Sequence, residues 1–194
     1  SSDLARVLER ASEAAKSAQL ELRRLFDLLH ADSVVGGLTP RLADLDALVI
    51  AYRELGYNTE LRTDGQAFAL DEGAEMCLYK IVYESLDNVR KHTQRGTNVT
   101  IEFTWVDPGL QLMIKDNGIE VESRLRVELG DLVEGYGLAE DLGALVQQID
   151  GSTLNAMRER AALYEGSVEA TLEPGVGFTV AAIFPNLRTV VEGK

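Results

Sequence analysis

Leucine and alanine residues recur along the first 30 positions at alternating spacings of four and three. The recurring positions are Leu4, Leu8, Ala11, Ala15, Ala18, Leu22, Leu25 and Leu29. A repeat of about 3.5 residues places them on one stripe of a helix, as in a coiled coil or a helix bundle. A single helix cannot bury this stripe, so we expect it to fold back on the chain or to pair with a second chain, and we favour pairing.

The pattern changes after this helix. Two glycines and a proline within residues 32–40 predict a linker. A second amphipathic helix is expected from about Arg41 to Leu55, ended by Gly56. A longer helix is expected to start after its cap, Asp71, and to bury the apolar residues of one face, which are Met76, Tyr79, Val82, Leu86 and Val89.

Alternation of apolar and polar residues predicts one single strand and two hairpins. The strands are expected at residues 57–63, 99–105, 110–114, 168–172 and 178–184. A turn at Asp107-Pro108-Gly109 joins the first hairpin, and a helix over about 154–164 precedes the second. Hairpins with interspersed helices predict an α+β fold, a two-layer sandwich whose mixed, mostly antiparallel sheet carries its helices on one face.

Composition narrows the range of partners. The chain has 19 Lys and Arg against 32 Asp and Glu, a net charge of −13, which argues against general binding to nucleic acid or to an anionic membrane. A local basic pocket for a small phosphate remains compatible with this charge. The one cysteine, Cys77, excludes a disulfide framework and is expected to be a buried small hydrophobe, which fits a reducing, cytoplasmic location. No stretch approaches 18 apolar residues.

The most distinctive polar cluster lies in the long predicted helix. Glu84, Asn88 and Lys91 share one helix face, and His92 is four residues from Asn88. The amide oxygen of Asn88 can ligate Mg²⁺, and the Lys91 ammonium and the His92 imidazole can face phosphate oxygens. The Glu84 carboxylate can accept a proton from a nucleophile. The simpler interpretation of the same residues is a solvated helix face with pairs at i and i+4.

Three further blocks follow in the sequence. Asp116-Asn-Gly118 places a carboxylate and a glycine at a strand end, and Gly151 precedes a helix containing Met-Arg-Glu-Arg-Ala at 157–161. Gly175 and Gly177 lie in the turn of the last hairpin. Each block alone indicates only a turn or a helix start.

Together, in this order, the four blocks resemble the catalytic ATP-binding domain of sensor histidine kinases of the GHKL ATPase superfamily, of the nitrate/nitrite-sensor type. The resemblance covers about residues 41–187. It implies the two-layer GHKL sandwich, preceded by a long coiled-coil-like helix of the dimerisation and phosphotransfer bundle over 1–31. Residues 32–40 are then the linker, and 188–194 a C-terminal tail.

The resemblance also implies a role for each residue of the motifs. Glu84 would be the catalytic base, Asn88 would hold Mg²⁺ on the triphosphate of ATP, and Lys91 and His92 would lie near the phosphates. Asp116 would accept a hydrogen bond from the adenine amino group. The glycines expected to complete the cofactor site are Gly118, Gly151, Gly175 and Gly177, and residues 119–150 would form the ATP lid.

The implied function is a cytoplasmic histidine kinase domain that binds Mg-ATP and transfers the γ-phosphoryl group to a histidine. His92 belongs to the motif and His30 is followed by Ala31 rather than an acid, so the acceptor is expected on a bundle helix absent from this chain, which would not autophosphorylate alone. The implied partners are a response regulator and a second copy of the chain, bound through the N-terminal helix. A membrane would be reached only through a region N-terminal to this sequence, in a membrane-anchored sensor.

Two alternatives remain open. Glu120 and Thr153 stand where the family has glycines, which favours a degenerate, non-catalytic GHKL module acting by dimerisation and partner binding. A soluble kinase directed at serine on a regulatory protein is the other alternative, and the N-terminal apolar stripe argues mildly against it.

Overall fold

The computed structural model of the chain describes Arg6, Glu9, Arg10, Ser12 and Glu13 together with residues 39–118, 153–173 and 176–188. The chain divides into two compact units, Ser1–Pro40 and Arg41–Lys194. In the first unit the described helical residues are all exposed. Glu9, Arg10 and Glu13 are among them, as expected for positions off the apolar stripe, whose own residues lie outside the described part.

The second unit opens with two consecutive short helices. A 3₁₀ turn, η1 (Leu42–Asp44), leads directly into α2 (Leu45–Glu54), which buries Leu45, Val49 and Tyr52. Gly56 follows with φ of 96°, the left-handed conformation that ends many helices. The helix predicted over 41–55 is therefore confirmed, with a tighter first turn.

The longest helix of the second unit is α3 (Glu72–His92). It starts as predicted, because the Asp71 carboxylate accepts a hydrogen bond from the backbone N–H of Ala74 at 2.7 Å. Acidic residues lie in its first turn and Arg90, Lys91 and His92 in its last turn, so both ends complement the helix dipole.

A five-stranded sheet forms one layer of the unit, with strand order β1-β2-β3-β5-β4. Its strands are β1 (Asn58–Asp64), β2 (Asn98–Val106), β3 (Gly109–Asp116), β4 (Ser167–Glu173) and β5 (Gly177–Phe184). β1 pairs with β2 in parallel, and the other three pairs are antiparallel. The mixed, mostly antiparallel sheet is confirmed, and its first strand begins one residue later than predicted.

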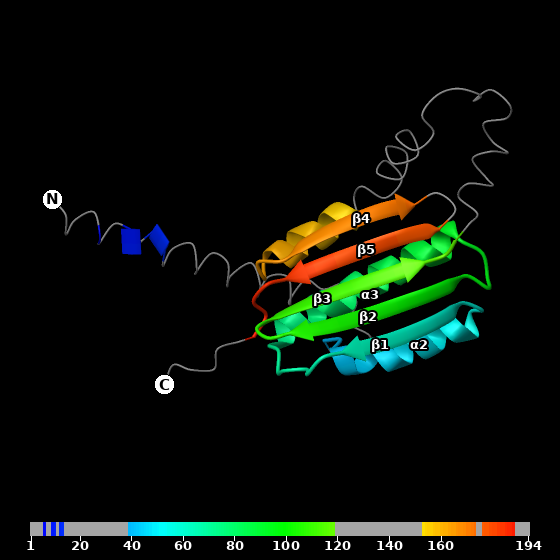
Figure 1. Cartoon of the computed structure of the whole chain (residues 1–194), viewed down its shortest axis with the longest axis horizontal. Coiled ribbons are helices and arrows are strands. Elements are labelled where there is room, and N and C mark those ends of the chain that lie inside the picture. The colour runs from blue at the N-terminus through cyan, green and yellow to red at the C-terminus, as the bar shows by residue number, and fades with distance from the viewer. Residues whose placement is uncertain are drawn as a thin grey trace, which may run out of the picture. The chain divides into compact units, whose positions relative to one another are not determined.

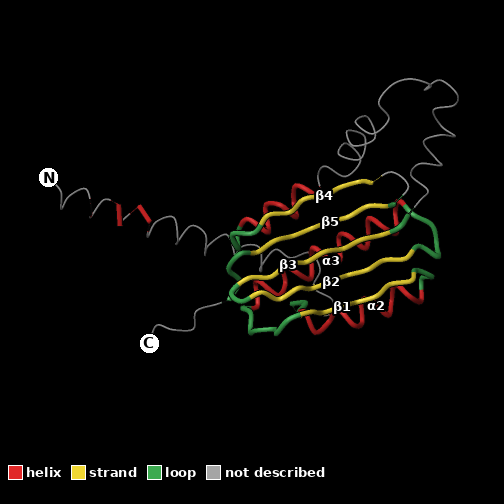
Figure 2. Tube along the Cα trace, viewed as in Figure 1, coloured by secondary structure: helices red, strands yellow, loops and turns green. Residues whose placement is uncertain are grey.

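The helices α2 and α3 and the helix at residues 153–162 cover one face of this sheet, as Figures 1 and 2 show. The alternation predicted for β2 holds, since Val99, Ile101, Phe103 and Trp105 are all buried in the core. Cys77 is buried there as well. Trp105 meets the ring of Phe68 edge-on at 5.0 Å between centroids.

Across the described residues, none of the helices combines the length and the apolar character that crossing a membrane requires.

Candidate functional site

The C-terminal half of α3 carries the first group of predicted site residues. The helical spacing holds over Glu72–His92, so Glu84, Asn88, Lys91 and His92 lie within about 100° of one another around the helix axis. The sheet side of the same helix is apolar and fixed by core packing. The polar face is therefore presented by a helix that has little freedom to rotate.

Asn88 is the most constrained member of this face. Its side chain is 8% exposed, and its Oδ1 atom is buried without a hydrogen-bond partner among the described residues. A buried carbonyl oxygen left unpaired is costly, by about 1–3 kcal/mol. Such an oxygen can accept a contact from a ligand.

Lys91 and its neighbour Arg90 both contact Asp87. The Lys91 ammonium lies 2.7 Å from one carboxylate oxygen of Asp87, and Arg90 lies 2.7 Å from the other. Burial alone would raise the pKa of Asp87, but hydrogen bonds from Lys91 and Arg90 outweigh it and the pKa is lowered. The predicted contact of Lys91 with phosphate would therefore require exchange of this ion pair.

The second group of predicted residues forms a tight turn at the end of β3. The Asp116 carboxylate accepts a hydrogen bond from the backbone N–H of Gly118 at 2.9 Å, which closes an Asx turn. Burial raises the pKa of Asp116, and the N–H groups of Gly118 and Phe178 oppose that rise. Asp116 is thus a partly buried acceptor on a rigid turn, which suits recognition of a hydrogen-bond donor.

Gly177, at the start of β5, lies directly against this turn. A Cβ atom at Gly177 would come within 1.8 Å of the Asp116 carbonyl oxygen, and the residue has φ of 135°. No other residue type fits that conformation and that spacing. The structure therefore brings Asp116, Gly118 and Gly177 together at one end of the sheet.

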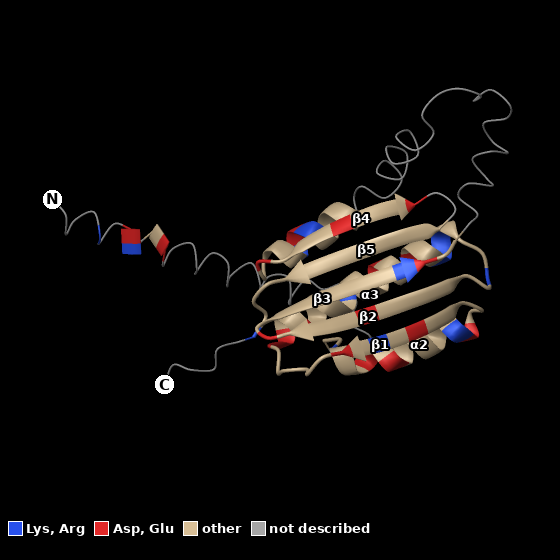
Figure 3. Cartoon of the chain, in the orientation of Figure 1, with Lys and Arg blue, Asp and Glu red and all other residues tan. Residues whose placement is uncertain are grey.

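The turn also meets the end of α3, so the motif blocks on α3, β3 and β5 converge at one end of the sheet. A Cβ atom at Gly118 would come within 2.3 Å of the Thr93 methyl carbon, immediately after α3. Figure 3 shows Lys and Arg at the end of α3, at the tip of β3 and in the loop after α3. A local basic end on a chain of net charge −13 favours an anionic ligand there.

Two predicted glycines and one predicted segment cannot be placed. Gly151, Gly175 and residues 119–150 lie outside the described residues. Within the described part of the chain, no group of three or more His, Cys, Asp or Glu residues could hold a metal ion.

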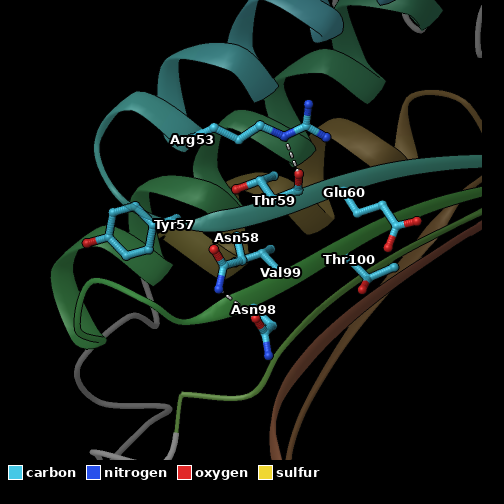
Figure 4. Close-up of a pocket in the computed structure, with 8 residues that line it drawn as sticks. All are labelled: Arg53, Tyr57, Asn58, Thr59, Glu60, Asn98, Val99 and Thr100. Carbon is cyan, nitrogen blue, oxygen red and sulfur yellow. Dashed lines mark hydrogen bonds between the residues drawn. The ribbon is translucent and has the colours of Figure 1, made fainter.

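A pocket of about 440 Å³ opens beside the starts of β1 and β2, next to α2 (Figure 4). None of the predicted site residues lines it. Its walls include Asn58 and Asn98, whose side chains are hydrogen-bonded to each other at 2.9 Å. Asn98 in turn contacts Asn117, the middle residue of the Asp116–Gly118 turn.

The sequence reasoning missed Thr93 and Asn98, which contact the turn from two sides. A weak signal existed for Thr93, because it directly follows the basic last turn of a helix and hydroxyl residues hydrogen-bond to helix ends. No local signal pointed to Asn98, since its contact with Asn117 exists only once β2 and β3 have paired.

The chain was compared with known protein families, curated proteins and solved structures. The family model described as "Histidine kinase-, DNA gyrase B-, and HSP90-like ATPase" matches residues 73–188, more than half of the chain. None of the curated proteins compared with the chain matches it.

Among solved structures, a chain of the mycobacterial sensor histidine kinase MprB is 15% identical with a TM-score of 0.48, and the match covers 76% of this chain and 94% of that one. The histidine kinase domain of the blue-light activated kinase EL346 from Erythrobacter litoralis is 16% identical with a TM-score of 0.48, covering 94% of this chain and 87% of that one. The matched residues include nearly all of α3, the turn after β3 and the last hairpin. This match shows that the chain belongs to the histidine kinase-, DNA gyrase B- and HSP90-like ATPase family.

Proposed function

We propose that this chain is the cytoplasmic ATP-binding kinase domain of a two-component sensor histidine kinase. It binds Mg-ATP at the end of the sheet where α3, β3 and β5 converge, and it delivers the γ-phosphoryl group to a histidine on a bundle helix supplied outside this sequence. A response regulator is its downstream partner, and a second copy pairs with it through the N-terminal helix. The family membership and the order of the motifs support this proposal.

The observation that carries the proposal is the unpaired oxygen of Asn88. A buried amide oxygen on the polar face of α3, with no partner among the described residues, suits a hard cation that prefers oxygen ligands. The residues present fit Mg²⁺ of this kind, which usually takes one or two protein oxygens, several waters and the phosphate oxygens of its nucleotide. When bound, the cation neutralises charge on the triphosphate.

The remaining residues act by binding and orienting the reactants. Asp116 accepts a hydrogen bond from the adenine amino group, and Gly118 and Gly177 allow the close packing that holds its turn in place. His92 lies beside the phosphates, and Lys91 joins it when its ion pair with Asp87 opens. Glu84, half-buried on the same face, takes the proton from the attacking histidine.

Calorimetric titration with ATP, with and without Mg²⁺, tests the proposal. We expect Asn88→Ala to weaken binding of Mg-ATP by about tenfold or more while leaving binding of metal-free ATP unchanged, because only the cation contact is lost. The melting temperature should not fall, since the substitution removes a buried oxygen that has no partner.

Ser85→Ala is the matched control. Ser85 is buried one turn earlier on α3, and its hydroxyl donates to the Ile81 carbonyl at 2.7 Å. We expect this variant to lose about 1 kcal/mol of stability and to keep wild-type affinity for Mg-ATP. Absence of binding at millimolar ATP in a folded wild-type sample would refute the proposal.

One observation favours the alternative of a degenerate, non-catalytic module acting by dimerisation and partner binding. Lys91 is engaged by Asp87 rather than directed to a phosphate site. Under this alternative, Glu84→Gln in the full-length protein would leave signalling intact, whereas a kinase would lose it.

A further inference from the structure

Thr93 is the first residue after α3, and its conformation is fixed by two hydrogen bonds to one carbonyl group. Its backbone N–H and its hydroxyl both donate to the Val89 oxygen, at 2.9 and 2.8 Å. Because the hydroxyl is directed back to the helix, the rotamer of the side chain is set. The methyl carbon is the other branch of the same side chain, so its direction is set as well.

That methyl group packs against Gly118. The Thr93 Cγ2 atom would lie only 2.3 Å from a Cβ atom placed on Gly118, and the Thr93 Cβ atom 3.0 Å from it. The glycine backbone is therefore in direct contact with the threonine. The contact joins the end of α3 to the turn that carries Asp116.

The opposite side of the turn is held by asparagines. The backbone N–H of Asn98 donates to the Asn117 side chain at 2.7 Å, and the Asn117 N–H donates to the Asn98 carbonyl at 3.1 Å. Asn58 supports Asn98 through the hydrogen bond drawn in Figure 4. The turn is therefore fixed to β2 on this side, and it also contacts β5 at Gly177 and Phe178 and the Thr93 methyl after α3.

We infer that Thr93 is a positioning residue that sets the Asp116 carboxylate for the base of the nucleotide, and so determines selectivity for adenine. The inference rests on the proposed function. The Asp116 carboxylate is oriented by the N–H groups of Gly118, at 2.9 Å, and Phe178, so a shift of Gly118 disturbs one of the two bonds that hold it. Thr93 limits that shift because its methyl occupies the space into which Gly118 would move.

The selectivity follows from hydrogen-bond chemistry. Adenine presents an amino donor where guanine presents a carbonyl acceptor, and a carboxylate accepts from the first and repels the second. Discrimination of this kind depends on a fixed acceptor, because a mobile carboxylate can turn away from the wrong base. A looser turn therefore costs affinity for ATP and reduces the penalty for GTP.

Thr93→Ser keeps the hydroxyl bond to α3 and removes only the methyl. Calorimetric titration with Mg-ATP, Mg-GTP and Mg-tripolyphosphate measures the two ends of the nucleotide separately. We expect ATP affinity to fall about tenfold, equivalent to about 1.4 kcal/mol, with the GTP-to-ATP ratio of dissociation constants falling in parallel. Tripolyphosphate affinity should not change, because it has no base.

Thr97→Ser is the matched control. The hydroxyl of Thr97, like that of Thr93, donates to a backbone carbonyl, in this case that of Gln94 at 2.8 Å, and the residue is buried. This variant loses the same methyl without touching Gly118, and we expect wild-type nucleotide selectivity. Thr93→Val, which retains a methyl toward Gly118, is expected to stay within about threefold of wild type for ATP.

If the wild type binds ATP selectively and Thr93→Ser behaves like Thr97→Ser, the inference is overturned and the proposed function stands. Equal losses for ATP and tripolyphosphate would also overturn it, because they indicate a general loss of structure. Wild type that binds no adenine nucleotide refutes the proposed function itself.

Discussion

At the scale of single residues, Asp116 shows how a proposed binding residue can oppose stability. Burial raises the pKa of its carboxyl group, which means that the folded protein holds the charged form less well than the unfolded chain does. The Gly118 and Phe178 N–H groups recover part of that loss. The sequence has an aspartate at this position although an uncharged asparagine would be easier to bury. This choice is expected if the carboxylate binds a ligand.

Asp116→Asn should therefore raise the melting temperature at pH 7. The pKa of this carboxyl group in the folded state lies above the ordinary value of about 3.9, so the group is neutral in both the folded and the unfolded state at lower pH. As the pH rises through the folded-state pKa, the wild-type protein loses free energy of unfolding. The gain in the variant should vanish near pH 4. Calorimetric melting at both pH values measures the effect, and an equal shift at both would contradict it.

The site residues predicted from the sequence were those that belong to short local motifs. A Cβ atom at Gly118 or at Gly177 would collide with neighbouring atoms, and Gly177 also has a positive φ, so both positions require glycine. Thr93 could not be assigned, because the role that we propose for it depends on a turn about 25 residues away in the sequence. Contacts of that kind are made by the tertiary fold and leave no periodic pattern.

At the scale of secondary-structure elements, both edge strands are covered by an arginine from a flanking helix. Arg53 of α2 donates its Nε–H to the Thr59 carbonyl of β1 at 2.7 Å (Figure 4). Arg158, from the helix at 153–162, donates to the Val168 carbonyl of β4 at 3.1 Å. Each bond occupies an acceptor on a strand that is free to recruit another chain.

Arg53→Ala and Arg158→Ala should each lower the free energy of unfolding by about 1–2 kcal/mol, since a charge-assisted hydrogen bond to a carbonyl is lost. Urea denaturation measures this change, and sedimentation velocity measures self-association through the uncovered edge. Arg62→Ala is the control, because Arg62 pairs with Glu60 on an exposed surface at 2.8 Å. Its effect should stay within about 0.5 kcal/mol.

The elements themselves were largely predictable. Asp71 capped its helix as expected, and the alternation of Val99, Ile101, Phe103 and Trp105 gave a strand with one buried face. The parallel pairing of β1 with β2 had no local signal, because α3 and its flanking loops separate the two strands. Pairing across such a distance is decided by packing of the helix layer.

At the scale of the whole molecule, the apolar N-terminal stripe predicts a dimer. Leu22→Glu places a charge on the stripe and should convert the chain to a monomer, whereas Ser17→Glu, off the stripe, should not. Sedimentation equilibrium measures the mass of each variant. The melting transition of the unit from Arg41 onwards should be the same in both, since the two units are separately compact. A Leu22→Glu variant that remains dimeric would contradict pairing through this stripe.

The position of Trp105 has a practical consequence. It is the one tryptophan of the chain, buried against Phe68 near the far end of β2. Val99, which pairs with Asp116, lies six residues away along β2, or about 20 Å. The fluorescence of Trp105 should therefore change when the sheet unfolds and stay constant when a nucleotide binds. Unfolding can then be followed by fluorescence in the presence of a ligand, provided that the ligand does not absorb at the excitation wavelength.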